Sequence, residues 1–300
     1  MKVRIESIGS VRHDSIEPVE SIDLLEIASK ECLEKSKYIS HDIDLILYSG
    51  VYRSNFLSEP AVAAILAKQL DLNAKLQDER RTFAFDVMNG GIGFFNAILT
   101  AMNFLQTGEA KAAMIATAEI ENNKGKAETT KLGVNETAGT FILDVHEGPT
   151  GFGPFLIQNH TDQINDRVTN LSWKEDTGMS YLDHSVSDSS EDNYRNAICK
   201  TLEAYTKKYE IDLNEFDVII PPQMSDSFCT ALKETLSLRN TLLVNVFELC
   251  TNVPENDFLT SSLPVAIKEG IDQRQIKSGD KALFICAGAG IQVGCIAYQF

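Results

Sequence analysis

Apolar positions along the chain change between short runs that are typical of strands and spacings that are typical of helices. At residues 82–87 aromatic and aliphatic side chains alternate with small and polar ones, which predicts a buried strand. At residues 94–105 apolar residues recur every three or four positions, which predicts a helix with one buried face. Gly90 and Gly91 lie between the two. The pattern therefore predicts a strand, a tight glycine turn and a helix, around which the rest of the chain is arranged.

The order of predicted elements occurs twice. The first copy has a helix at 24–32, a strand at 43–47, a helix at 60–70, the strand and helix of the glycine turn, and strands at 112–116 and 138–145. The second has a helix at 197–205, a strand at 216–220, a helix through Leu232, Leu236 and Leu238, and two strands within 282–298. Matched features are about 170 residues apart. Independent convergence on common α/β patterning is the alternative, but a duplicated α/β unit with a central cleft explains the spacing better.

Residues 148–192 separate the two copies and have a weaker pattern. This stretch is polar, contains two prolines and Trp173, and shows no sustained strand or helix spacing. We therefore predict a connecting and capping region. The expected organisation is an N-terminal half at 1–147, the connection at 148–192 and a C-terminal half at 193–300.

The composition is typical of a soluble globular protein. Of 300 residues, 43% are hydrophobic and 23% are charged, and the N-terminal strand contains no apolar leader, so a cytoplasmic location is expected. The net charge of −16 argues against binding to nucleic acid. Residues 282–298 carry no charge, but three glycines interrupt them, which favours two buried strands over a membrane helix.

Six cysteines are scattered along the chain without a C-x-x-C pair. This scatter argues against both a structural zinc site and a disulfide framework. We expect reduced and mostly buried thiols, with no metal and no other cofactor.

Five segments in order carry a resemblance to a known family. They are the strand and glycine turn at 84–91, the turn at 136–139, the Ile-Ile-Pro-Pro-Gln sequence at 219–223, the segment at 256–264 and the glycine loop at 288–291. They resemble the thiolase superfamily, and within it the β-ketoacyl-[acyl-carrier-protein] synthase III branch. The resemblance covers most of the chain. It implies a thiolase-like α/β fold with two pseudo-symmetric halves in a layered αβαβα arrangement.

Active members of that family use a cysteine to accept the acyl group, with a histidine and an asparagine that stabilise developing negative charge. Matched position by position, the cysteine falls on Gly91, the histidine on Pro222 and the asparagine on Asp257. Glycine has no side chain, proline has no N–H donor, and an ionised aspartate would repel an enolate. The resemblance therefore implies a member that lacks the catalytic triad. No histidine lies near Gln223 in the sequence.

The N-terminal segment also departs from the family. There, a longer segment between the first strand and the first helix helps to clamp the adenine of coenzyme A with a tryptophan and an arginine. Here residues 11–21 are too short for such a clamp, and the single tryptophan is Trp173. The loss of the clamp points away from an enzyme that uses acyl-CoA unaided.

One feature of family dimers is retained. The loop at 49–58 places Phe56 where those dimers carry a phenylalanine that crosses the two-fold interface and lines the neighbour's acyl pocket. Local packing of a loop aromatic is the alternative. In a dimer, Phe56 would act in the site of the partner.

Three functional hypotheses follow. The first is a non-catalytic subunit that pairs with an active β-ketoacyl synthase III homologue, as a heterodimer or heterotetramer, in fatty-acid or polyketide-type biosynthesis. Like a chain-length factor it would shape the acyl pocket of its partner, and it would meet acyl carrier protein through that partner. The second is an acyltransferase that uses another group in the same cleft, such as Cys250 or Glu119. The third is a homodimer that binds an acyl ligand in the cavity.

Overall fold

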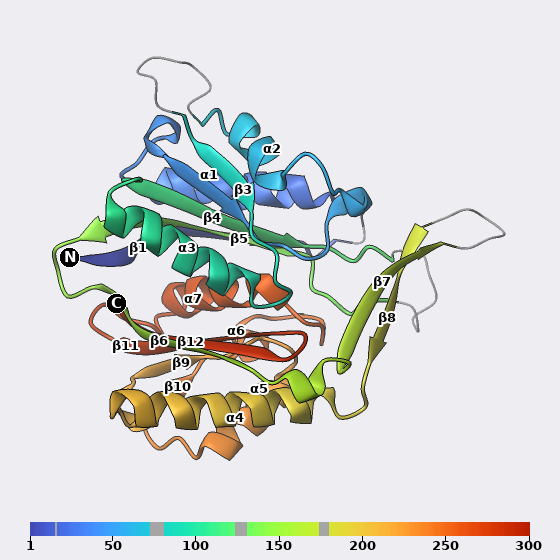
Figure 1. Ribbon diagram of the computed structural model, residues 1–300, viewed down its shortest axis with the longest axis vertical. Coiled ribbons are helices and arrows are strands. Elements are labelled where there is room, and N and C mark those ends of the chain that lie inside the picture. Colours follow the sequence, from blue (N-terminus) through green and yellow to red (C-terminus); the bar gives the residue numbers. More distant parts are fainter. Residues whose placement is uncertain (16, 73–80, 124–130, 174–179) are drawn as a thin grey trace.

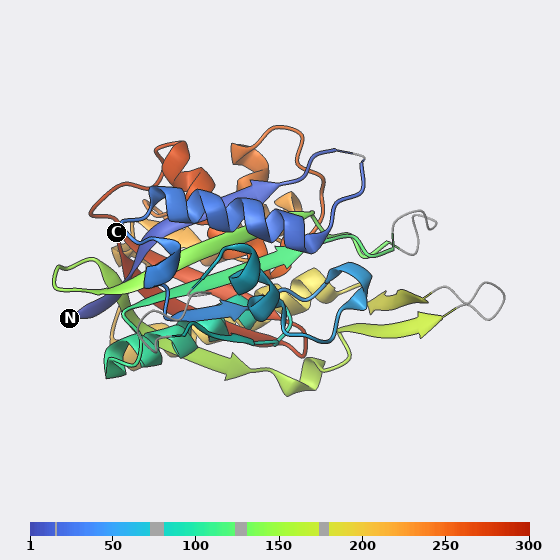
Figure 2. The same ribbon diagram turned by 90° about the horizontal axis from the view of Figure 1, so that it is seen from above.

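Two five-stranded sheets alternate with three layers of helices in the order αβαβα (Figure 1). The computed structural model describes residues 1–15, 17–72, 81–123, 131–173 and 180–300. The layering is the arrangement that the sequence predicts. Both termini lie at the same side of the molecule (Figure 2).

The first half of the chain forms the first sheet. Its elements are β1 (Lys2–Arg12), α1 (Ser21–Lys35), β2 (Leu45–Tyr48), α2 (Val62–Gln69), β3 (Phe83–Asp86), α3 (Gly93–Thr107), β4 (Ala112–Glu119) and β5 (Thr137–His146). The strands lie in the order β1-β5-β4-β2-β3. β2 is parallel to β3 and β4, whereas β5 is antiparallel to β1 and β4. β4 is buried at every position because helices cover both faces of the sheet.

The second half repeats this topology. Its elements are β6 (Gly151–Asn159), α4 (Ser190–Tyr209), β9 (Val218–Ile220), α5 (Asp226–Leu236), β10 (Leu242–Leu243), α6 (Val246–Leu249), α7 (Ser262–Asp272), β11 (Lys281–Gly288) and β12 (Gln292–Gln299). The sheet order β6-β12-β11-β9-β10 matches the first sheet strand for strand, in both position and direction. The predicted duplication is confirmed. The uncharged stretch forms β11 and β12, and no helix in the described ranges is long and apolar enough to cross a lipid bilayer.

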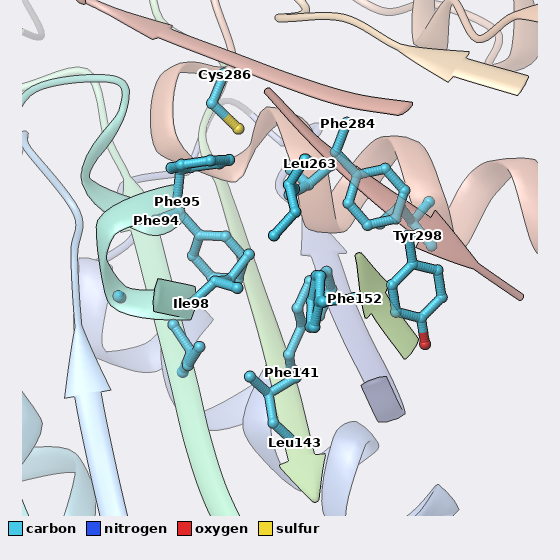
Figure 3. Close-up of a cluster of buried hydrophobic side chains, with 14 of the residues drawn as sticks. Phe94, Phe95, Ile98, Phe141, Leu143, Phe152, Leu263, Phe284, Cys286 and Tyr298 are labelled. Carbon is cyan, nitrogen blue, oxygen red and sulfur yellow. The ribbon is translucent and has the colours of Figure 1, made fainter. Parts of the chain in front are cut away.

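Helices α3 and α7 form the layer between the two sheets (Figure 1). Phe94 of α3 packs edge-on against Phe141 of β5, with ring centroids 5.0 Å apart. Phe94 and Phe95 face the cluster of side chains from both sheets and α7 that includes Leu263 (Figure 3). The start of α3 is therefore held between the two halves of the molecule.

The strand before the glycine turn is not buried as predicted. β3 lies at the edge of the first sheet, where β2 is its only partner among the described strands, and Phe83 is 55% exposed. The alternation of apolar residues predicted the strand correctly. The alternation does not show whether β3 is a central strand or an edge strand, because the order of strands in a sheet depends on long-range topology.

The predicted connecting region contains more structure than expected. Residues 151–159 form β6, an edge strand of the second sheet, and α4 begins at Ser190. Between them β7 (Arg167–Trp173) and β8 (Ser180–Val186) form an antiparallel hairpin that projects from the body (Figure 2). No position of β7 or β8 is fully buried, and β6 is buried only at its first two positions, so their sequences lack the apolar runs of the central strands.

Candidate functional site

A pocket of about 220 Å³ lies beside the glycine turn that precedes α3. Its lining includes Gly91 from the first half, and Pro222 and Asp257 from the second. The backbone at residues 287–289, at the end of β11, also forms part of the wall. The structure thus brings together the three positions that the sequence predicts, although they are far apart in the chain.

The glycine turn packs against β11 backbone to backbone. Gly93 N donates to Gly90 O over 2.9 Å, and the Asn89 side chain donates to Gln292 over 2.8 Å. A Cβ atom at Gly91 would lie 2.5 Å from the carbonyl oxygen of Ala287, well inside van der Waals contact. A side chain at position 91 would therefore require the backbone to move.

Pro222 is held in place by the residue that follows it. Gln223 is fully buried, and its side-chain amide donates to Pro221 O and Val244 O while its oxygen accepts from Val246 N. The satisfied amide fixes the loop after β9. Pro222 consequently presents a ring without an N–H donor to the pocket.

Asp257 forms an ion pair that the sequence did not predict. Its Oδ2 accepts from Arg167 Nη1 at 2.7 Å, and its Oδ1 accepts from Leu259 N at 2.8 Å. The side chains of Arg167 and Asp257 are only 17% and 12% exposed. Burial opposes the charge of Arg167, but attraction to Asp257 and nearby tyrosines prevails, and the pKa of the guanidinium is raised. The carboxylate at this position is therefore balanced by a cation.

A chain of hydroxyl groups joins the pocket to a histidine. The Tyr52 hydroxyl lies 3.1 Å from Thr169 Oγ1, which lies 2.7 Å from His184 Nδ1. Burial and the Arg167 charge both lower the pKa of His184, so the neutral ring is favoured. Tyr52 and Thr169 line the pocket, whereas His184 lies behind Thr169. No spacing in the sequence indicated this histidine.

None of the six cysteines, all within the described ranges, lines the pocket. Cys229 lies behind Pro222, with Sγ 3.8 Å from the Pro222 carbonyl oxygen, and burial raises its pKa. Cys250 ends α6, and burial raises its pKa as well. The hypothesis that placed Cys250 in this cleft is therefore wrong.

Glu119 also lies outside the pocket lining, contrary to the same hypothesis. Its side chain is fully buried and accepts from Val51 N at 3.0 Å, Tyr52 N at 2.9 Å and the Thr260 hydroxyl. Burial raises its pKa to about 7. Glu119 therefore supports the loop that forms one wall of the pocket.

Comparisons with known proteins place this geometry in context. Residues 206–300 match the family model described as 3-oxoacyl-[acyl-carrier-protein (ACP)] synthase III C terminal. Over 96% of its length the chain is 23% identical to the beta-ketoacyl-[acyl-carrier-protein] synthase III of Oceanobacillus iheyensis, covering 86% of that protein. It is 24% identical to the protein of the same name from Wolbachia pipientis of Culex pipiens, covering 87% of it.

Solved structures show the same architecture. Xanthomonas campestris OleA, crystallised with bound lauric acid and lauroyl-CoA, superposes with a TM-score of 0.81 at 14% identity, over 100% of this chain and 99% of that one. The 3-oxoacyl-[acyl-carrier-protein] synthase III of Aquifex aeolicus gives 0.75 at 17% identity, over 99% and 100%. The chain has the thiolase-like fold of the synthase III proteins. The predicted fold class is thereby confirmed.

No metal centre is evident among the described residues. In the part of the chain that the structure describes, no group of three or more His, Cys, Asp or Glu side chains is placed to hold an ion. The pocket lining instead offers one ion pair, two tyrosines, a threonine and a serine among apolar groups. Such a lining can bind and orient a ligand, but its described residues include no thiol and no imidazole.

Proposed function

We propose that this synthase III-like chain is a non-catalytic subunit that pairs with an active ketosynthase homologue and shapes its acyl pocket in fatty-acid or polyketide-type biosynthesis. One observation carries the proposal: a Cβ atom added at position 91 would lie 2.5 Å from the carbonyl oxygen of Ala287. Position 91 matches the acyl-accepting cysteine of the family. It has no nucleophile, and the surrounding backbone leaves no room for one.

The remaining thiols do not offer a replacement. Burial raises the pKa of Cys32, Cys286 and Cys295 to about 12, so the reactive thiolate form is scarce at neutral pH. The pKa of Cys199 is raised for the same reason. These shifts support a chain that does not itself carry an acyl group on sulfur.

The exposed edge of the first sheet supports pairing. Phe83 stands on edge strand β3 and forms an aromatic cluster with Phe85 and Phe104, at centroid distances of 4.9 and 6.0 Å. An open strand edge with an exposed aromatic is a surface that commonly pairs with another chain. A synthase homologue of the same fold would offer a matching edge. A second copy of this chain is the alternative partner.

Phe56 belongs to the loop whose Arg53 pairs with Asp86 at the end of β3. It is half-buried, has a left-handed backbone with φ of +54°, and lines a hollow of about 350 Å³ together with Met88 and Leu171. This hollow and the pocket beside Gly91 share Val51, Tyr52 and Thr169 in their linings. The proposal assigns Phe56 to the wall of the partner's acyl pocket, and this role stays a prediction.

Co-expression with a synthase III homologue encoded in the same genome tests the proposal. Native mass spectrometry should show a 1:1 complex, and the partner should make a different range of chain lengths in the complex than alone. A variant complex in which the partner's cysteine is replaced by alanine should lose condensation completely. An acyl adduct on the isolated chain by intact mass, or condensation by that chain alone, would overturn the proposal.

A further inference from the structure

We infer that the pocket beside Gly91 binds a small uncharged molecule through its carbonyl oxygen, which accepts hydrogen bonds from Arg167 and Tyr194. The inference concerns what this chain holds in its own pocket, and it does not depend on pairing with a synthase. It rests on unused donors, on the balance of charge and on the size of the pocket.

Arg167 has hydrogen-bonding capacity that the described residues leave unused. Its Nη1 donates to Asp257, while its Nε is enclosed without a partner. No described residue accepts a hydrogen bond from Nη2. Because the side chain lines the pocket, this N–H group is available to a ligand there.

Tyr194 is a second unused donor at the same place. It is only 3% exposed, its ring stacks 5.6 Å from the Arg167 guanidinium carbon, and no described residue accepts from its hydroxyl. Burial raises the pKa of this phenol, so it stays protonated and can donate. The hydroxyl oxygen is not among the enclosed polar atoms that lack a partner, so it opens on the pocket, where a water or a ligand oxygen can accept its hydrogen bond. Two donors that open on one pocket can therefore hold one ligand oxygen.

The charges around the pocket favour an uncharged acceptor. Asp257 already balances Arg167 at 2.7 Å. A carboxylate ligand would therefore add one uncompensated negative charge in a partly enclosed site, in a chain whose net charge is −16. A ketone, amide or ester carbonyl accepts the same hydrogen bonds without that penalty.

The size and apolar lining limit the rest of the molecule. A volume of about 220 Å³ corresponds to roughly seven water molecules at liquid density. Val51, Met224 and Leu259 provide aliphatic or thioether surface in the lining. A short aliphatic or small cyclic group beyond the carbonyl satisfies both conditions.

Hexanamide and hexanoate form a matched pair of probes, since they have the same number of non-hydrogen atoms and differ in charge at neutral pH. Their binding to the isolated chain can be measured by calorimetry or ligand-observed NMR. We expect wild type to bind hexanamide at least about tenfold more tightly than hexanoate. Tyr194→Phe should weaken hexanamide binding roughly 3- to 10-fold. Tyr209→Phe, on the same helix but with its hydroxyl on Phe155 O, is the control that should leave binding unchanged.

Asp257→Asn provides the sharper test, because it leaves the charge of Arg167 unbalanced while retaining an oxygen for Leu259 N. In this variant hexanoate should become the tighter ligand. No saturable binding of hexanamide to wild type, a preference of wild type for hexanoate, or an unchanged preference in Asp257→Asn would each overturn the inference. Circular dichroism shows whether Tyr194→Phe and Asp257→Asn are folded. If one of the two variants does not fold, the binding data for the other still test the inference. Failure here would leave the co-expression result unaffected.

Discussion

Gly91 and Gly288 allow two backbones to approach because neither carries a Cβ atom. A Cβ at Gly91 would lie 2.5 Å from Ala287 O, and one at Gly288 would lie 2.9 Å from Ile92 N. Restoring the family's cysteine therefore creates a steric conflict as well as a thiol. The chemistry and the packing at this position cannot be changed separately.

We predict that Gly91→Cys lowers the free energy of unfolding by about 1–3 kcal/mol through overpacking and does not accept an acyl group. Urea unfolding measures the first effect, and intact mass after incubation with acyl-CoA measures the second. Gly91→Ala should cost a similar amount, because the conflict arises at Cβ. An acylated, fully stable Gly91→Cys protein would contradict the steric argument.

Glu119 should make stability depend on pH. Its pKa in the folded protein is about 7, above the ordinary value of 4.5, so the folded state retains a proton that the unfolded state loses between these values. Stability therefore decreases as pH rises through this range. Relative to Glu119→Gln, wild type should lose roughly 2–3 kcal/mol between pH 5 and pH 8, as measured by urea unfolding. Parallel pH profiles for the two proteins would show that the carboxyl is not responsible.

The three positions matched to the family's triad were predictable because each follows a recognisable strand or turn. Arg167, Tyr194 and His184 were not predictable. Arg167 and Asp257 are 90 residues apart, and Arg167 begins an exposed hairpin whose sequence has no motif. Their proximity depends on the base of the hairpin meeting the pocket, a long-range contact that periodicity does not encode.

At the scale of elements, buried strands and amphipathic helices were predicted well. β4 and β11 are covered on both faces, so almost every residue in them is apolar and the runs stand out. β6, β7 and β8 are edge or projecting strands that need only a partial apolar face. Their patterns therefore resemble those of a loop.

The contact between β12 and α3 can be tested by one added methyl group. A Cβ at Gly294 would lie 2.8 Å from the ring of Phe95. Gly294→Ala should therefore reduce stability by about 1–3 kcal/mol. Phe95→Leu removes ring atoms at this contact, so the double variant should be more stable than the sum of the two single effects predicts. If the two changes in unfolding free energy, measured by chemical denaturation, are strictly additive in the double variant, the Phe95 ring is not what opposes a methyl group at position 294.

At the scale of the whole molecule, the two halves share one central helical layer, so α3 and the pocket are fixed by both. The net charge of −16 gives the surface a field that repels acidic proteins. Under the proposed function, acyl carrier protein would therefore be recruited by the partner subunit. Pairing itself would rely on apolar surface and an open strand edge.

The exposed aromatic on β3 provides the test of that pairing surface. Phe83 is 55% exposed on the free edge of the first sheet. Ile271 of α7 is 41% exposed and shares a hollow with β1, the strand at the opposite edge of that sheet. Phe83→Lys places a charge where an edge-to-edge partner would pack, so it should weaken the complex at least tenfold in a native mass spectrometry titration. Ile271→Lys should leave the affinity unchanged. Equal losses of affinity in the two variants would indicate a general effect of added charge. A loss of affinity only in Ile271→Lys would show that the interface lies on the opposite face.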